Sequence, residues 1–270
     1  WVSETVYDEL LALCQFLPGP GSTQTAAALG WVRAGPLGAV LALSGFVLPA
    51  ALIMAAAGYG ASAYGALIPD GVRTGLLAAA AAVVSAAVLS MAQIHARRPA
   101  GAGLAVLGLA ATLAGGYSPV PLAAIQPGVI VVGAALGAGL LRPLEGSASA
   151  EPAPRTGRAR GALIALALFA AGLIILPLLA GEARVIALAD AVYRAGALVF
   201  GGGHVVLPLL DAGTVPAFLD RETFLAGYGL AQSIPGPVFT FAAFLGAAAG
   251  EGPAGAALFA ITAVLAIFTP

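Results

Sequence analysis

The sequence is poor in charged residues and in cysteine. Only 9% of its 270 residues are charged, whereas about a quarter are charged in an average soluble domain. The single cysteine, Cys14, excludes an internal disulfide bond and a metal site built from several cysteines. No Walker A, His-Glu-x-x-His or Cys-x-x-Cys motif occurs, and no basic cluster suits a nucleic acid. The sequence therefore predicts neither an enzyme nor a metal, cofactor or nucleic-acid site.

Apolar residues dominate the chain instead. They make up 60% of it, and the mean hydropathy is +1.01. A spanning helix needs about 20 predominantly apolar residues, so we expect an all-α, polytopic membrane protein. The candidate spans are residues 37–60, 72–94, 101–117, 119–141, 161–180, 185–210 and 253–270.

One polar linker, residues 142–160, divides the chain. It is rich in proline, serine, glycine and alanine, and we predict an N-terminal half over 1–141 and a C-terminal half over 161–270. Arginines favour the cytoplasmic side of a membrane, so the linker and Arg97-Arg98 are expected inside and Asp70 outside. Because the chain starts at Trp1 and stops within an apolar run, we expect both halves to be cut short.

Each half carries a copy of one polar motif. Gln15 stands three residues before Pro18-Gly19-Pro20, and Gln232 stands three residues before Pro235-Gly236-Pro237. The offset of 217 residues between them also pairs Thr23 with Thr240 and Tyr7 with Phe224. Further on, Phe46-Val47-Leu48-Pro49 resembles Phe268-Thr269-Pro270 if a small insertion near Glu251-Gly252-Pro253 is allowed. The halves are therefore predicted to be an imperfect repeat.

The motif predicts a discontinuous helix in each half. Proline and glycine interrupt a helix, and each flanking apolar piece, within 5–33 and 222–250, is too short to span alone. If each stretch crosses the membrane once, the halves have inverted topology. If each stretch instead re-enters as a hairpin, the count loses one crossing and the two halves have the same orientation in the membrane. We favour the inverted, crossing arrangement.

Paired helix breaks at membrane depth are typical of a transporter's substrate site. A helix that starts after each break presents unpaired N–H groups and a partial positive charge, which suit a small oxyanion. Hydroxyls and amides nearby could add donors. A packing role for the two kinks is the alternative. The predicted substrate-binding residues are Gln15, Pro18, Gly19, Pro20, Ser22, Thr23, Gln24, Gly201, Gly202, Gly203, Gln232, Pro235, Gly236, Pro237 and Thr240.

Three titratable residues are candidates for proton coupling. His204 follows the glycine triplet and could titrate near neutral pH, although a neutral histidine bonded to a carbonyl is the simpler interpretation. Glu9 precedes the first break and could lie at membrane depth or at the interface. Glu222 begins the second broken stretch, where an acidic residue in the first helical turn is ordinary.

At these residues the chain resembles the chromate transporter family. The likeness rests in the first half on Gln15, Pro18-Gly19-Pro20, Ser22-Thr23-Gln24, Gly30, Gly35, Gly38-Ala39, Phe46 and Leu48-Pro49. In the second half it rests on Phe200-Gly201-Gly202-Gly203-His204, Pro208-Leu209-Leu210, Glu222-Thr223-Phe224, Gly227-Tyr228, Gln232, Pro235-Gly236-Pro237 and Phe244-Leu245-Gly246. The resemblance implies a two-domain inner-membrane protein that exports chromate, coupled to the proton gradient, and confers chromate resistance.

Two alternatives to chromate export stay open. The substrate could be sulfate or another small oxyanion, because sites made of N–H donors do not distinguish tetrahedral dianions of similar size. A non-transporting membrane scaffold would use the glycines only for packing, but such a protein has no need of two polar breaks. A homodimer in the bilayer is also left open.

Overall fold

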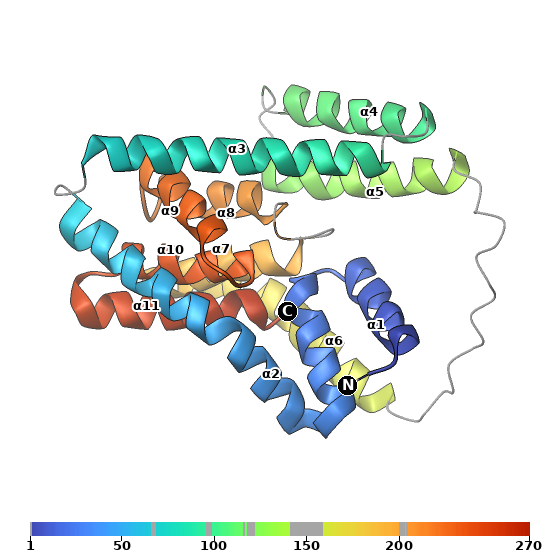
Figure 1. Ribbon diagram of the computed structural model, residues 1–270, viewed down its shortest axis with the longest axis horizontal. Helices are drawn as coiled ribbons and strands as arrows, with labels where there is room; N and C mark the ends of the chain where they lie inside the picture. The colour runs from blue at the N-terminus through green and yellow to red at the C-terminus, as the bar shows by residue number, and fades with distance from the viewer. Residues whose placement is uncertain are drawn as a thin grey trace. The chain divides into compact units, whose positions relative to one another are not determined.

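The structure is a computed structural model that describes residues 2–65, 69–95, 99–115, 117, 122–140, 159–199, 203 and 205–270. Within these residues all regular structure is helical, as the composition predicted (Figure 1). The elements are α1 (Glu4–Phe16), α2 (Gly21–Tyr64), α3 (Asp70–His95), α4 (Pro99–Gly115), α5 (Leu122–Leu140), α6 (Ala159–Leu179), α7 (Arg184–Ala197), α8 (Val206–Thr214), α9 (Arg221–Ser233), the 3-10 helix η2 (Val238–Thr240), α10 (Phe241–Ala249) and α11 (Gly252–Phe268).

The chain forms two compact units. One contains residues 85–166, in which α4 and α5 pair as antiparallel helices. There, Gly108 lies opposite Val129 and Gly115 lies opposite Ile125. The other unit contains residues 1–84 and 167–270, and it holds both copies of the repeated motif. The predicted linker 142–160 lies almost entirely outside the described residues, so the predicted halves remain a prediction.

The first copy of the motif is the tip of a helical hairpin. α2 is interrupted at Ala34 and Gly35, whose backbone is not helical, so it consists of a leg over 21–33 and a leg over 36–64. α1 packs against the first leg, and the two run antiparallel (Figure 1). At the open end, Glu4 lines the same cavity as Arg33. We call residues 4–33 the first hairpin.

The second copy is also the tip of a hairpin. The chain turns back between α9 and α10, because Asp220 at the start of α9 and Ala248 near the end of α10 line one cavity, at the open end. The two helices pack through the Phe224 and Phe241 rings, which stack edge to face at 5.1 Å, and through Gly227, which faces the ring of Phe244. We call residues 221–249 the second hairpin. Each broken stretch therefore turns back on itself, and the crossing form that we favoured is wrong.

The two hairpins nevertheless enter from opposite ends of the unit. The second leg of α2 begins at the open end of the first hairpin. It runs parallel to α10, with Ala50 beside Gly236 and Gly58 beside Phe244. It ends where Ser62 and Gly65 line the cavity at the open end of the second hairpin. The leg is about 40 Å long at 1.5 Å per residue, so the repeat is inverted as expected.

Residues 185–210 also differ from the prediction, and this explains why the two copies are inverted although both broken stretches turn back. Residues 185–210 were predicted to span, but α7 and α8 form a third hairpin. Arg184 at the start of α7 lies over the Phe218 ring, 5.7 Å from its centroid, beyond the end of α8. Gly213 meanwhile packs on Ala191 midway. Because this segment also turns back, the chain crosses the membrane one time fewer before residue 222. The second broken stretch therefore enters from the side opposite to the first.

The repeat is more regular than the sequence indicated. At the offset of 217 residues, α1 and α9 begin and end at equivalent positions, and so do the starts of α2 and η2. The turn after each hairpin is a glycine with positive φ followed by proline: Gly35 has φ 62° and Gly252 has φ 64°. The offset thus extends to the start of the third helix of each copy, with no insertion near residues 251–253. The likeness of Phe46-Val47-Leu48-Pro49 to Phe268-Thr269-Pro270 does not follow this offset.

Much apolar surface lies exposed on the helices. Leu107 and Leu113 of α4 and Leu258 and Leu265 of α11 are more than half exposed, which suits contact with lipid. Two of the described helices, Gly21–Tyr64 and Asp70–Ser90, are long and apolar enough to cross a membrane, and several others are apolar but shorter.

Candidate functional site

The two breaks have matching backbone geometry. Gly19 and Gly236 have φ values of 121° and 153°, a region that residues with a Cβ rarely adopt. Three residues after each second proline, a buried threonine closes the first helical turn. Thr23 Oγ1 donates to the Pro20 carbonyl at 2.8 Å, and Thr240 Oγ1 donates to the Pro237 carbonyl at 2.8 Å. Neither hydroxyl hydrogen is therefore free for a ligand, contrary to the expectation that threonine side chains add donors.

Backbone N–H groups remain available at both breaks. Thr23 and Gln24 donate to Pro20, and Thr240 donates to Pro237. The N–H groups of Gly21, Ser22, Val238 and Phe239 precede any helical acceptor, and neither helix has a side-chain cap. Each break therefore offers two N–H donors and the positive end of a helix dipole.

A short segment between α7 and α8 contacts both breaks. The Gly19 N–H donates to the Val199 carbonyl at 2.9 Å, and Val199 is fully buried. At the other side of the segment, a Cβ on Gly203 would lie 3.1 Å from the Cβ of Val238. Val199 and Gly203 thus each contact one break, while Gly201 and Gly202 lie outside the described residues.

The glutamines differ in how the structure places them. Gln24 Nε2 donates to the Pro18 carbonyl at 2.8 Å and secures the first break. Gln232 lies beside the Tyr228 hydroxyl, one turn earlier, and its Nε2 is buried without a partner of good geometry among the described residues. Gln15 is in the last turn of α1, but its side chain is not among those described.

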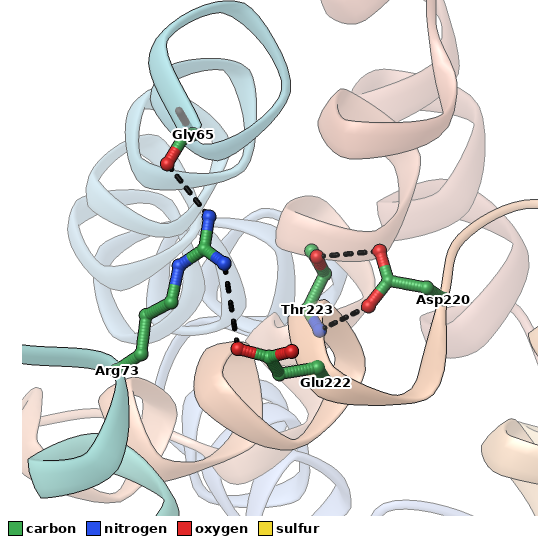
Figure 2. A network of polar contacts seen from close by, with 5 residues as sticks. All are labelled: Gly65, Arg73, Asp220, Glu222 and Thr223. Atoms are coloured by element: carbon green, nitrogen blue, oxygen red, sulfur yellow. Dashed lines mark hydrogen bonds and ion pairs between the residues drawn. The ribbon is translucent and has the colours of Figure 1, made fainter. Parts of the chain in front are cut away.

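Glu222 lies far from either break, at the mouth of a cavity of about 540 Å³ at the open end of the second hairpin. Figure 2 shows its surroundings: Glu222 pairs with Arg73 at 3.4 Å, and Arg73 also donates to the Gly65 carbonyl at 2.7 Å. The cavity is bounded by α2, α3, α9 and α10 and reaches Leu230. It leads from this end toward the second break.

Asp220 caps α9 beside Glu222. Its Oδ1 accepts from the Thr223 N–H at 2.8 Å and its Oδ2 from the Thr223 hydroxyl at 2.8 Å (Figure 2). Partial burial acts to raise the pKa of Asp220, but these hydrogen bonds outweigh it and hold the pKa below the usual 3.8. The other two proton-coupling candidates are less informative: Glu9 is exposed on α1, and His204 lies outside the described residues.

Sequence reasoning missed one ion pair inside the unit. Asp190 on α7 is 3% exposed and pairs with Arg194 one turn later. Its Oδ1 is buried without a partner among the described residues. The spacing of four residues between an acid and a base within an apolar span could have identified the pair.

Both copies of the Pro-Gly-Pro break lie in regions that match one family of known proteins. The chromate transporter family model matches residues 1–140 and 186–270. The chain belongs to this family. The unmatched interval contains the predicted linker. No solved structure matches the chain.

Curated relatives match along almost the whole chain. A chromate transport protein of Pseudomonas aeruginosa is 29% identical over 99% of this chain and 62% of its own length. A probable chromate transport protein of Synechococcus elongatus is 29% identical over 100% of the chain and 64% of its own length. A chromate transport protein of Cupriavidus metallidurans is 28% identical over 91% and 58%. The chain thus spans about three fifths of the length of these relatives.

Proposed function

We propose that this chain belongs to a secondary transporter that moves chromate across the bacterial inner membrane. The observation that carries the proposal is that two inverted helix breaks contact the two ends of one short segment, Gly19 at Val199 and Val238 at Gly203. The family supplies the substrate class, since its model and three relatives are described by chromate transport. Membrane transporters built on inverted repeats bind substrate where such breaks meet.

The arrangement suits a dianion that must be released again. Four N–H groups, those of Gly21, Ser22, Val238 and Phe239, supply donors without a fixed full charge, and two helix dipoles add about one positive charge in total. The Gln232 amide, beside the Tyr228 hydroxyl, can add a neutral donor. We propose Pro18, Pro20, Pro235, Pro237 and the glycine triplet as the backbone frame of the same site.

The direction of transport follows from the proposed orientation. We place the open end of the first hairpin, with Arg33, in the cytoplasm, and the end with Asp70 outside. Chromate then enters between the first hairpin and its neighbours and leaves through the cavity at Glu222, coupled to the proton gradient. Cysteines at Ser149 and Asp70, after Cys14 is replaced, should label from opposite sides of intact cells. Labelling of both from outside would overturn this orientation.

The decisive experiment is chromate flux by the full-length parent protein in proteoliposomes, with sulfate as competitor. We expect chromate flux that responds to an imposed pH gradient. Flux of sulfate with no chromate flux would replace the substrate. The absence of any anion flux from correctly oriented protein would favour a scaffold role, and cross-linking in the bilayer would test a homodimer.

A further inference from the structure

An ion pair within α7 lies beside the first break. Asp190 is almost fully buried, and the Arg194 guanidinium donates to its Oδ2, while its Oδ1 has no partner among the described residues. The side chain of Arg194 is 49% exposed, so the guanidinium has an accessible face. Charges inside membrane helices are costly and usually serve function.

The position of the pair along α7 sets its depth. α7 begins at the open end of the second hairpin, where Arg184 pairs with Glu251 at 3.8 Å. At 1.5 Å per residue, Arg194 lies about 15 Å further along. The Leu198 N–H donates to the Arg194 carbonyl, so Arg194 is one turn before Leu198, the neighbour of Val199, whose carbonyl accepts from the Gly19 N–H. The pair is therefore at membrane depth and next to the first break.

Few other titratable groups surround Asp190. α11, which packs on α7, carries none, and neither does α6 around Phe169 and Gly172, where it contacts Tyr193. α8 contributes Asp211, which pairs with Arg221 at 2.9 Å. On α7 itself, Tyr193 donates to the Phe169 carbonyl. Cys14 is the titratable residue of the first hairpin near its tip. Arg194 is thus the cation that governs Asp190.

We propose that Arg194 binds the transported oxyanion at the first break and that Asp190 is the proton-binding group that controls it. This inference rests on the proposed function. When Asp190 is ionised, it holds the guanidinium. A proton on the free Oδ1 neutralises the carboxylate and releases Arg194, whose planar donors match two oxygens of a tetrahedral dianion. One proton and one dianion then leave the cell together, and the single net negative charge that they carry outward is driven by the inside-negative membrane potential.

The test measures apparent chromate affinity and proton flux of the full-length parent in proteoliposomes between about pH 8 and about pH 5. In the parent, affinity should rise as the pH falls. Arg194→Gln should weaken affinity roughly ten- to a hundredfold, the cost of a lost hydrogen bond to a charged ligand, and Arg194→Lys should recover only part of it. Asp190→Asn should bind chromate at high pH as the parent does at low pH, with proton flux uncoupled.

Three controls make the result decisive. Chromate itself protonates near neutral pH, so pH dependence that persists in Asp190→Asn measures the substrate's own titration. Asp211→Asn and Arg221→Gln break a comparable ion pair away from the break and should leave affinity and its pH dependence unchanged.

Unaltered affinity in Arg194→Gln, or parent-like coupling in Asp190→Asn, would overturn the inference while chromate transport stands. A parent that moves no chromate would instead remove the proposed function. If Asp190→Asn fails to fold, the two Arg194 variants decide.

Discussion

The first and second hairpins share a backbone but differ sharply in packing. Their helices, glycine conformations and threonine bonds coincide at the 217-residue offset. Yet Tyr7 is 44% exposed, whereas its equivalent Phe224 is fully buried. Most described side chains of α1 are exposed, whereas few side chains of its equivalent, α9, are exposed. Backbone geometry is therefore common to both copies, while burial is not.

The contacts that stabilise the two hairpins differ, although the backbone geometry of their breaks is the same. In the second hairpin, Phe241 packs against Phe224, Tyr228 and Phe244, so aromatic contacts hold α9 and α10 together. In the first hairpin, described bonds at the tip run from Gln24 to Pro18 and from Gly19 to Val199. At the tips themselves the burial is reversed, because Gly19 is buried and Gly236 is exposed. Since the surroundings of the two tips differ while their backbone geometry is the same, the shared geometry points to a shared task.

The largest effect is expected from a side chain at either break. Gly19→Leu and Gly236→Leu should each abolish chromate transport, because positive φ disfavours a Cβ and a bulky side chain blocks the N–H donors. At Gly236 a Cβ would also lie 2.5 Å from that of Ala50. Flux in proteoliposomes and membrane abundance measure the two properties separately.

A matched glycine gives the control for this experiment. Gly45, in the second leg of α2, has nothing within 4 Å of an added Cβ, so Gly45→Leu should transport normally. If both break variants also transport normally, the Pro-Gly-Pro motif has only a packing role.

The packing difference should appear in stability. Phe224→Ala should cost about 3–5 kcal/mol of unfolding free energy, as expected for a buried aromatic residue. The equivalent Tyr7→Ala should cost less than about 0.5 kcal/mol. Thermal unfolding of each variant in detergent measures this contrast. Equal losses would show that the first hairpin is held by burial after all.

Binding should depend equally on both copies, in contrast to stability. Gln15→Ala or Gln232→Ala should each weaken anion affinity by roughly ten- to a hundredfold, because a hydrogen bond to a charged ligand contributes about 1.5–3 kcal/mol. The double variant should lose more. Thermal midpoints serve as the control: a lower midpoint with unchanged affinity would make either glutamine structural.

The sequence predicted the helical class and the repeat, because each depends on composition or on proline and glycine at fixed spacing. It also predicted the inversion, but only because two errors in the count of crossings cancelled: the broken stretches and residues 185–210 turn back instead of crossing. It failed where tertiary contact decides. Residues 185–210 are predominantly apolar, and it is the contacts of Gly213 with Ala191 and of Arg184 with Phe218 that show that they turn back. Asp190 and Arg194 were overlooked because their depth follows from the contact of Gly19 with Val199. The match of Gly35-Pro36 with Gly252-Pro253 was readable at the offset already established.

The smallest expected effect concerns the helix caps, which also coincide in the repeat. Ser3 Oγ accepts from the Val6 N–H at 3.4 Å, and the equivalent Asp220 accepts from the Thr223 N–H at 2.8 Å. Asp220→Ala should cost about 1 kcal/mol of unfolding free energy and Ser3→Ala about 0.5 kcal/mol or less.

Because the pKa of Asp220 is lowered on folding, its ionised form stabilises the fold above the usual pKa, and this contribution is lost as the pH falls through the lowered value. Thermal midpoints measured from neutral pH to below pH 3.8 should therefore fall more in the parent than in Asp220→Asn. The Ser3→Ala variant should follow the parent, since serine does not titrate. A parent and an Asp220→Asn variant that lose stability in parallel would show that the cap contributes nothing through its charge.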